Sequence, residues 1–288
     1  DLNVPPPCAV TYKPSGLPSN VEITEFRGFT LDRFQREAIK SLSEGHSVVV
    51  SAATGTGKTL VADYVIDTYL EEDYDIVYTA PIKALSNQKF KDFTERYGRE
   101  NVGLLTGDVS INKDAPVRIM TTEIYRNMLV TGDSAIQDVA YVIFDEVHYL
   151  GDTERGTVWE ESIIFSPESV RFLCLSATIP NADEFAAWIQ EVKDHTVDVV
   201  SETERAVPLH HVFYDAQRGM GEFEDLEKWA KLEKHPQQFS SKKERRRYYK
   251  KIKSRKQKAH LNLVSELKAN GWLPTIYFCF SRKRCEAK

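Results

Sequence analysis

The chain has 288 residues, of which 41% are hydrophobic and 28% charged, and its formal net charge is −5 at pH 7. This composition is typical of a globular protein with one large domain or two modest ones. The negative net charge excludes nucleic-acid binding through overall charge, so any such binding would come from local patches. No apolar run reaches the roughly 18 residues of a membrane span, and the N-terminus lacks the features of a secretory signal, so we expect no membrane association.

The first segment, residues 1–28, is rich in Pro, Ser and Gly and predicts an extended arm with a short strand at 21–24. After Phe29 the pattern predicts a short helix capped by Asp32. Gln35 lies on this helix, and its amide offers one acceptor and two donors, which suits the edge of an adenine. The alternative for Gln35 is a solvated helix residue.

The stretch Ser-Ala-Ala-Thr-Gly-Thr-Gly-Lys-Thr at 51–59 follows an apolar strand and precedes a helical pattern. Strand, glycine loop and helix are the context that a phosphate-binding loop requires. Gly55 and Gly57 allow a tight turn of inward N–H groups, while Lys58 can reach β- and γ-phosphates and the Thr59 hydroxyl can bind Mg²⁺. The alternative is a glycine-rich turn that binds nothing. The loop residues predicted to bind the nucleotide are Ala53, Thr54, Gly55, Thr56, Gly57, Lys58 and Thr59.

From residue 75 onwards, apolar strand patterns alternate with helical patterns, which predicts an α/β fold with a parallel sheet covered by helices on both faces. Such sheets bind ligands at the carboxyl ends of their strands. Polar clusters at 52–59, 145–148 and 176–178 fall at those ends. The expected strands are 47–50, 75–79, 102–105, 117–120, 140–144 and 171–175, and the expected helices are 83–93, 123–130 and 182–190.

Asp145 and Glu146 directly follow the apolar strand at 140–144, which is the Walker B arrangement. Asp145 can hold Mg²⁺, so Thr59 and Asp145 are the predicted metal ligands. Glu146 can orient and deprotonate the attacking water, and His148 can link the nucleotide site to its neighbours. The predicted catalytic residues are therefore Lys58, Asp145, Glu146 and His148. Taken alone, Asp-Glu after a strand could also be a solvated turn.

The second half is more polar. The run at 242–256 is strongly basic with two tyrosines, so it could bind nucleic acid by charge and stacking, or be a solvated helix or a linker. Residues 259–271 predict a helix and 274–280 a strand. Of the four cysteines, Cys174 and Cys279 lie in apolar runs and are expected to be buried thiols, which fits a reducing, cytoplasmic environment.

These motifs together resemble the first RecA-like domain of a superfamily 2 helicase of the DExH-box class, and more narrowly the superkiller-type (Ski-like) RNA helicases that serve the exosome. Ala52 replaces the first glycine of the phosphate-loop motif, a form common in helicases. The matching stretches are 29–35, 52–59, 81–90, 105–108, 121–126, 145–150, 155–161 and 176–181. The resemblance implies an arm at 1–28, a first RecA-like ATP-binding domain at 29–204, an exit strand, linker and charged insertion at 205–258, and the start of a second RecA-like domain at 259–288.

The resemblance also implies roles for single residues. Phe29 would stack on adenine and Gln35 would bond its edge, while Ser176 and Thr178 would couple the nucleotide state to domain motion. A polar set would line a track for the nucleic-acid backbone, in keeping with hydroxyl, N–H and cationic groups that read no bases. Each of these polar loop residues could instead serve as a cap or turn. The set is Pro81, Lys83, Asn87, Thr106, Gly107, Asp108, Thr121, Thr122 and Arg126.

The function implied is an ATP-dependent RNA helicase that uses ATP and Mg²⁺ and moves 3′ to 5′ on single-stranded RNA. Partners would be single-stranded RNA and the RNA-degradation machinery, and a monomer is favoured. A DNA helicase of the related repair branch is one alternative, because backbone contacts do not separate RNA from DNA unless a 2′-OH is read. A non-hydrolysing ATP- and nucleic-acid-binding module is another, although Lys58 and Glu146 are both present. Since the sequence stops at Lys288, before the motifs that carry arginine fingers in this family, we expect a fragment that does not unwind.

Overall fold

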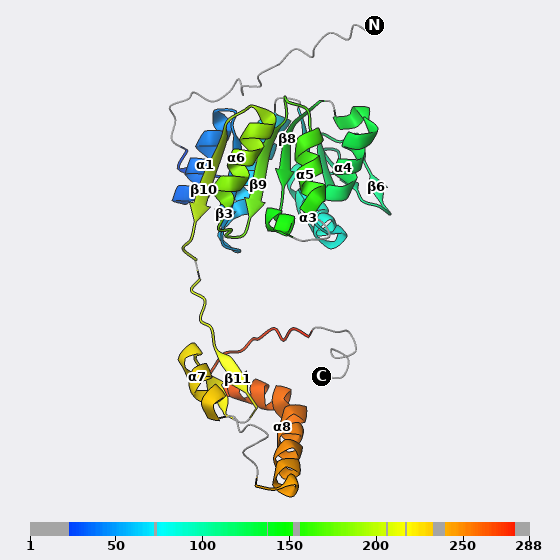
Figure 1. Cartoon of the computed structure of the whole chain (residues 1–288). Coiled ribbons are helices and arrows are strands. Elements are labelled where there is room, and N and C mark those ends of the chain that lie inside the picture. Colours follow the sequence, from blue (N-terminus) through cyan, green and yellow to red (C-terminus); the bar gives the residue numbers. More distant parts are fainter. Residues whose placement is uncertain are drawn as a thin grey trace. The chain divides into compact units, whose positions relative to one another are not determined.

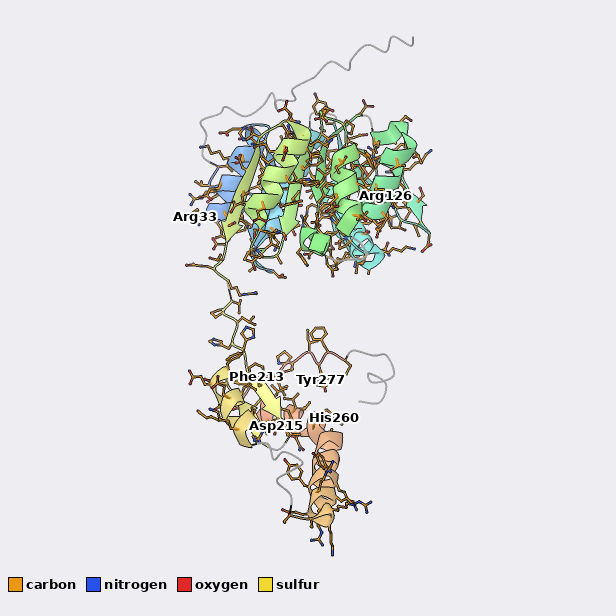
Figure 2. All side chains as sticks on the ribbon, in the orientation of Figure 1. Arg33, Arg126, Phe213, Asp215, His260 and Tyr277 are labelled. Carbon is orange, nitrogen blue, oxygen red and sulfur yellow. The ribbon has the colours of Figure 1, made fainter. Side chains whose placement is uncertain are left out.

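The computed structural model describes residues 23–71, 74–136, 138–151, 156–205, 207–216, 218–232 and 240–279. The chain divides into two compact units, Asp1–Ala206 and Val207–Lys288 (Figure 1). In Figure 2, Arg33 and Arg126 belong to the first unit, and Phe213, Asp215 and His260 to the second. Among the described residues, no helix combines the length and apolarity that a membrane crossing needs.

The first unit is built on one eight-stranded sheet with the strand order β10-β3-β9-β8-β4-β7-β5-β6. Every neighbouring pair is parallel except β5–β6, which is antiparallel. The central strands are buried along their whole length because helices cover both faces. The strands are β3 (Ser47–Ala52), β4 (Asp75–Ala80), β5 (Val102–Leu105), β6 (Ser110–Ile111), β7 (Val117–Thr121), β8 (Val139–Phe144), β9 (Arg171–Ser176) and β10 (Val197–Glu202).

Side chains of each central strand alternate between two apolar cores, one on each face of the sheet. One core joins the sheet to α1, α2 and α3, and the other joins it to α4, α5 and α6 (Figure 1). Val48 and Val50 of β3, for example, belong to the first core, and Val49 belongs to the second. The helices are α1 (Arg33–Ser43), α2 (Lys58–Leu70), α3 (Lys83–Tyr97), α4 (Thr122–Thr131), α5 (Gly156–Phe165) and α6 (Ala182–Lys193). The predicted α/β fold with a mostly parallel sheet is confirmed.

A small hairpin precedes the sheet, formed by β1 (Glu25–Phe26) and β2 (Phe29–Thr30). A short strand was expected at 21–24. Residues 23–24 form no strand and lie directly before β1, and residues 21–22 fall outside the described residues. Arg27, in the turn, forms a two-bond ion pair with Asp67 of α2, with 2.7 Å from Nε to Oδ2, and its guanidinium lies 4.9 Å from the Tyr97 ring centroid. These contacts anchor the hairpin to the helices.

The second unit contains the hairpin β11 (Phe213–Asp215) and β12 (Gly219–Gly221), followed by α7 (Phe223–Leu232) and α8 (Lys242–Ala269). The Met220 N–H donates to Glu266 Oε2 at 3.1 Å, which ties the hairpin to α8. The basic run is therefore helical, and α8 continues without a break through 258–259, where the sequence suggested a domain boundary.

Two expectations for the end of the chain are wrong for the residues that the structure describes. Residues 275–279 form no strand, since an extended segment becomes a strand only where a neighbouring strand completes its hydrogen bonds. Cys279 is consequently half-buried, whereas Cys174, on β9, is buried as predicted. Residue 280 and those after it, like the arm at 1–22, lie outside the described residues.

Candidate ATP site and nucleic-acid track

The strand order brings the three predicted nucleotide-site motifs together. The phosphate loop follows β3, Ser176 ends β9, and Asp145 follows β8, and these three strands are neighbours in the order β3-β9-β8. Because the strands are parallel, their carboxyl ends lie along one edge of the sheet. Motifs that lie far apart in the sequence thus form one site.

The loop itself has the geometry of an anion cradle. Gly55 and Gly57 adopt φ of +87° and +85°, in the left-handed region that glycine enters without strain. Gly57 is the N-cap of α2, and it has no side chain that could cap the N–H groups of that helix start. The N–H groups at the positive end of a helix dipole favour a phosphate, so the loop fits the triphosphate of ATP.

Lys58 is held inside the loop. Its Nζ donates to the carbonyl oxygens of Ala52 at 2.7 Å and Ala53 at 3.0 Å. Burial lowers the pKa of Lys58, and the nearby Glu146 and Asp145 carboxylates oppose that shift by favouring the charged form. The ammonium is therefore a partly desolvated cation beside the loop, and a phosphate could replace the two carbonyl contacts.

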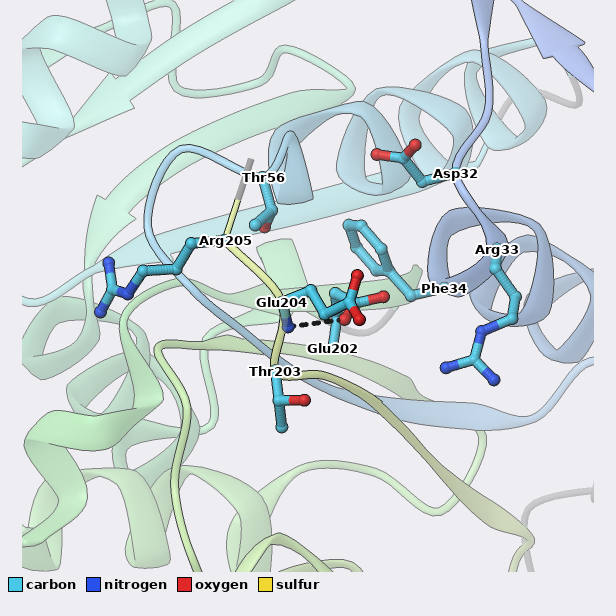
Figure 3. A pocket seen from close by; sticks show the side chains of 8 residues that line it. All are labelled: Asp32, Arg33, Phe34, Thr56, Glu202, Thr203, Glu204 and Arg205. Carbon is cyan, nitrogen blue, oxygen red and sulfur yellow. Dashed lines mark hydrogen bonds between the residues drawn. The ribbon is translucent and has the colours of Figure 1, made fainter. Parts of the chain in front are cut away.

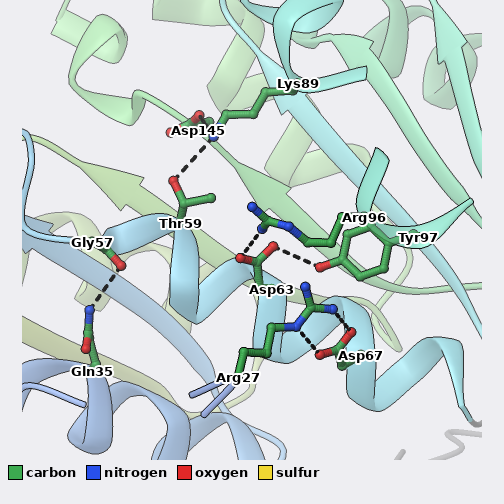
Figure 4. A network of polar contacts seen from close by, with 10 residues as sticks. All are labelled: Arg27, Gln35, Gly57, Thr59, Asp63, Asp67, Lys89, Arg96, Tyr97 and Asp145. Carbon is green, nitrogen blue, oxygen red and sulfur yellow. Dashed lines mark hydrogen bonds and ion pairs between the residues drawn. The ribbon is translucent and has the colours of Figure 1, made fainter. Parts of the chain in front are cut away.

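The predicted metal ligands lie close to a cation that the chain supplies itself. Lys89, on α3, places its Nζ 3.3 Å from Thr59 Oγ1 and 4.0 Å from Asp145 Oδ2 (Figure 4). The Tyr78 hydroxyl donates to Asp145 Oδ2 at 2.5 Å, and burial raises the pKa of Tyr78 so that it stays a donor. Two oxygen ligands that already share one positive charge fit Mg²⁺. Within the described part of the chain, no group of three or more His, Cys, Asp or Glu could hold a metal, so phosphate oxygens would complete the coordination.

Glu146 leaves β8 in a strained conformation, with φ of +57°, which is uncommon for a residue other than glycine. Its N–H donates to Asp145 Oδ1 at 3.0 Å, which fixes this turn of the backbone. His148 Nδ1 lies 3.3 Å from Glu146 Oε2, within reach of a hydrogen bond. The structure thus pairs the predicted general base with His148, and strain at this position is consistent with a functional site.

Gln35 is 4% exposed and braces the loop from α1. Its Oε1 accepts from the Asp32 N–H at 2.9 Å, forming a capping box, and its Nε2 donates to the Gly57 carbonyl at 3.1 Å. Nε2 also donates to the Thr56 carbonyl at 3.4 Å, so both of its N–H groups have acceptors. A solvated role is therefore wrong for this residue, and an adenine contact would use the second lone pair of Oε1 as an acceptor. Phe29, on β2, is 64% exposed, so its ring face is open to a ligand.

A hollow of about 540 Å³ lies beside the loop, between the start of α1, Thr56 and the segment after β10 (Figure 3). Its size suits a small ligand. However, three carboxylates (Asp32, Glu202 and Glu204) and two guanidinium groups (Arg33 and Arg205) line it, so it has no excess of positive charge to attract a triphosphate. The phosphates therefore belong at the start of α2.

The two predicted coupling residues differ in their surroundings. Ser176 is fully buried, and its Oγ has no hydrogen-bond partner within the described residues. On the neighbouring strand, Ser51 Oγ accepts from the Ile179 N–H at 3.1 Å, which links the loop after β9 to the end of β3. Thr178 is exposed. The segment at 176–179 is thus tied directly to the strand that feeds the phosphate loop.

The predicted track lies along the next part of the same sheet edge. Pro81 follows β4, Thr121 ends β7 and Thr106 follows β5, which are neighbours in the order β4-β7-β5. Exposed Lys83, at the start of α3, pairs with Asp108, and Gly107 and Asn87 are also exposed.

The side chains of Thr121 and Thr122 are buried, with Thr122 at 0% exposure, so a contact from them would come from the backbone at the start of α4. Arg126 is half-buried, and its Nη1 lies 3.3 Å from Glu161 Oε2. Its role on the track stays a prediction.

Lys89 and Tyr78 are absent from the predicted site, although both touch its centre. Tyr78 lies inside an apolar strand and Lys89 among other polar residues of a helix, so neither carries a local pattern that marks it. Lys89 does fall in a stretch that carries the family resemblance, at 81–90, and this was the one available signal.

Comparison with known proteins agrees with this geometry. Residues 32–185 match the family model for DEAD/DEAH box helicases. Because the match spans more than half of the chain, the protein belongs to this family, and the predicted helicase class is confirmed.

Among the similar proteins are helicases of the DExH-box and superkiller type. The chain is 43% identical over 273 residues to the DExH-box ATP-dependent RNA helicase DExH9 of Arabidopsis thaliana, with 90% of this chain and 27% of that protein covered. It is 54% identical over 181 residues to the antiviral helicase SKI2 of Saccharomyces cerevisiae, covering 63% and 14%, respectively. The chain also matches the probable helicase HelY of Mycobacterium tuberculosis, with 42% identity over 273 residues and coverage of 90% and 30%. It thus spans less than a third of the length of these relatives.

A solved structure agrees at the level of the fold. The crystal structure of the DUF1998 helicase MrfA bound to DNA superimposes with a TM-score of 0.51 and 20% identity, over 60% of this chain and 27% of that one. At this identity the likeness concerns the fold alone.

Proposed function

We propose that this chain is the ATP-hydrolysing first RecA-like domain of an RNA helicase that moves 3′ to 5′ on single-stranded RNA. The observation that carries the proposal is the convergence of Lys58, Thr59 and the Asp145-Glu146 pair at adjacent strand ends. A cation, a hydroxyl, a metal-binding carboxylate and a second carboxylate are the groups that nucleotide hydrolysis needs in one place.

Each residue has a task that follows from its position. Mg²⁺ would be held by Thr59 and Asp145 and would neutralise charge on the phosphates. Lys58 exchanges the carbonyls of Ala52 and Ala53 for phosphate oxygens. Glu146 orients the attacking water and takes its proton.

His148, 3.3 Å from the Glu146 carboxylate, holds that side chain in place. Phe29 stacks on the base and Gln35 bonds its edge while bracing the loop.

The nucleic acid lies across the track after β4, β7 and β5, next to the nucleotide site on the same edge of the sheet. Support for a backbone-reading track comes from the exposed Lys83, Asn87 and Gly107 and from the helix start at Thr122. Such groups bind phosphate and sugar without reading the sequence. RNA is favoured over DNA because a relative at 43% identity is named as an ATP-dependent RNA helicase.

The wider activity rests on the family resemblance. In helicases of this type, arginine fingers from a second RecA-like domain complete the ATP site, and a finger is worth about 10³–10⁵ in rate. We therefore propose that these 288 residues alone bind ATP, hydrolyse it slowly and do not unwind duplexes. The intact protein would be a cytoplasmic monomer that serves RNA degradation.

The test is steady-state ATP hydrolysis by the intact protein with single-stranded RNA, with single-stranded DNA, or with neither. RNA stimulation well above that by DNA is expected. Stimulation by DNA alone would favour the repair-type DNA helicase, and ATP binding without turnover under all three conditions would favour a non-hydrolysing module.

A further inference from the structure

Lys89 lies between Thr59 and Asp145, the two side chains that would hold the metal. Its ammonium is 3.3 Å from Thr59 Oγ1 and 4.0 Å from Asp145 Oδ2 (Figure 4). We propose that Lys89 is a positioning residue that reserves the metal site: it balances Asp145 while no metal is bound and is displaced when a divalent cation arrives with the nucleotide. This inference rests on the proposed ATP site.

Burial explains why Asp145 needs such a partner. The Asp145 side chain is 14% exposed and that of Lys89 is 18% exposed. A carboxylate withdrawn this far from water is costly unless it is paired or hydrogen-bonded. Tyr78 supplies one hydrogen bond to Oδ2, and Lys89 supplies a positive charge 4.0 Å from the same oxygen, in addition to that of the nearby Lys58.

The Lys89 ammonium also contacts two aromatic rings. Lys89 Nζ lies 5.4 Å from the Tyr78 ring centroid and 6.0 Å from that of Phe93, within the range of a cation–π interaction. The two rings pack edge to face, with centroids 5.1 Å apart. Lys89 is thus held at the site by its surroundings, in contrast to an exposed lysine that moves freely.

A divalent cation bound by the Thr59 hydroxyl and the Asp145 carboxylate would compete with Lys89 for the same two oxygens, because like charges repel strongly at contact distance. A metal ion alone would have to overcome that competition. A metal ion that arrives with a triphosphate brings additional oxygen ligands, and these allow it to displace the Lys89 ammonium from the two oxygens. Lys89 therefore makes metal binding conditional on nucleotide.

The test uses Mn²⁺ as the probe, with binding followed by electron paramagnetic resonance on the whole chain, in the absence of nucleotide and with the non-hydrolysable analogue AMP-PNP. Lys89→Met should lower the half-saturating Mn²⁺ concentration without nucleotide by about five- to tenfold, the effect expected for one partly screened charge pair. Lys89→Arg, which keeps the charge, should stay within about twofold of the wild type.

Lys91→Met is the matched control, since Lys91 is an exposed lysine on the same helix, and it should change nothing. Unchanged or weaker Mn²⁺ binding by folded Lys89→Met protein, with circular dichroism as the check of folding, would overturn the inference. So would a loss of AMP-PNP affinity in Lys89→Met at zero metal, because it would make Lys89 a phosphate-binding lysine. If wild-type protein bound no AMP-PNP at all, the proposed ATP site would fail instead, and the nucleotide-free Mn²⁺ comparison would still decide the role of Lys89.

Discussion

Gly57→Ala tests how the phosphate loop is built. Gly57 has φ of +85°, and a Cβ added to it would lie 2.7 Å from Gln35 Nε2. The substitution therefore has two effects: it puts an L-residue into the left-handed region, and it pushes away the side chain that braces the loop. Gly132, which ends α4 with φ of +66° and has nothing within 4 Å of an added Cβ, would suffer the first effect alone.

The two effects can be given magnitudes. The left-handed conformation costs about 1–2 kcal/mol for a residue with a Cβ. Displacing Gln35 breaks its 3.1 Å bond to the Gly57 carbonyl and leaves a buried amide poorly paired, which costs about 1–2 kcal/mol more. Gly57→Ala should therefore destabilise the chain by about 2–4 kcal/mol, and Gly132→Ala by about half of that.

The assay is thermal or urea unfolding of the whole chain, followed by circular dichroism, for Gly57→Ala and Gly132→Ala in the wild-type and Gln35→Ala backgrounds. In the Gln35→Ala background the clash is gone, so the cost of Gly57→Ala should fall to that of Gly132→Ala. If the excess cost of Gly57→Ala survived the removal of Gln35, the brace between α1 and the loop would not be its cause, and the reasoning would be refuted.

Three further predictions follow from other residues. Burial and the neighbouring Arg171 lower the pKa of His195 from 6.5 to about 4. Between these two pH values the unfolded chain binds one more proton than the folded chain. The free energy of unfolding should therefore fall as the pH drops through this window, by about 1–2 kcal/mol after allowing for solvent screening. His195→Gln should remove that part of the pH dependence. Phe29→Ala should weaken the binding of ATP and of GTP by a similar factor in a binding assay, since a base stack is worth about 1–3 kcal/mol and every base has a ring face to stack. Arg126→Ala should weaken RNA binding equally for all sequences and reduce the salt slope by about one.

Each of these has a result that would contradict it. An unchanged pH profile of unfolding in His195→Gln would show that another group titrates. An unchanged ATP affinity in Phe29→Ala would remove Phe29 from the base site. A change in base preference on Arg126→Ala would argue against recognition of the nucleic-acid backbone. Glu161→Gln is the control, because it removes the ion-pair partner of Arg126 while the charge of Arg126 is kept. It separates structural damage from the loss of a contact with RNA.

Local patterns were sufficient to predict most of the fold and the centre of the site. The phosphate loop and the Asp145-Glu146 pair are short motifs whose chemistry depends on neighbours in sequence, so they can be recognised without tertiary information. The alternation of strands and helices predicted the sheet, and Asp32 was correctly predicted as the cap of α1.

Features that depend on tertiary packing were not predictable in this way. Lys89 reaches Thr59 and Asp145 because α3 packs beside β4 and α2 begins nearby, a relation that no local spacing encodes. Thr122 was expected to line the track, yet its side chain is buried at the junction of β7 and α4. The strand expected at 274–280 has the right composition and no strand to pair with among the described residues.

The most direct test of the central claim is ATP binding and single-turnover ATP hydrolysis by Glu146→Gln, measured in the intact protein with single-stranded RNA. The amide keeps the shape of the side chain but cannot accept the proton of the attacking water. ATP affinity should therefore stay near the wild-type value while the hydrolysis rate falls by about 10²–10⁴. Glu95→Gln, an exposed carboxylate on α3, serves as the matched control and should hydrolyse ATP normally. Hydrolysis by Glu146→Gln near the wild-type rate would contradict the account, because the strained residue after Asp145 would then not be the base.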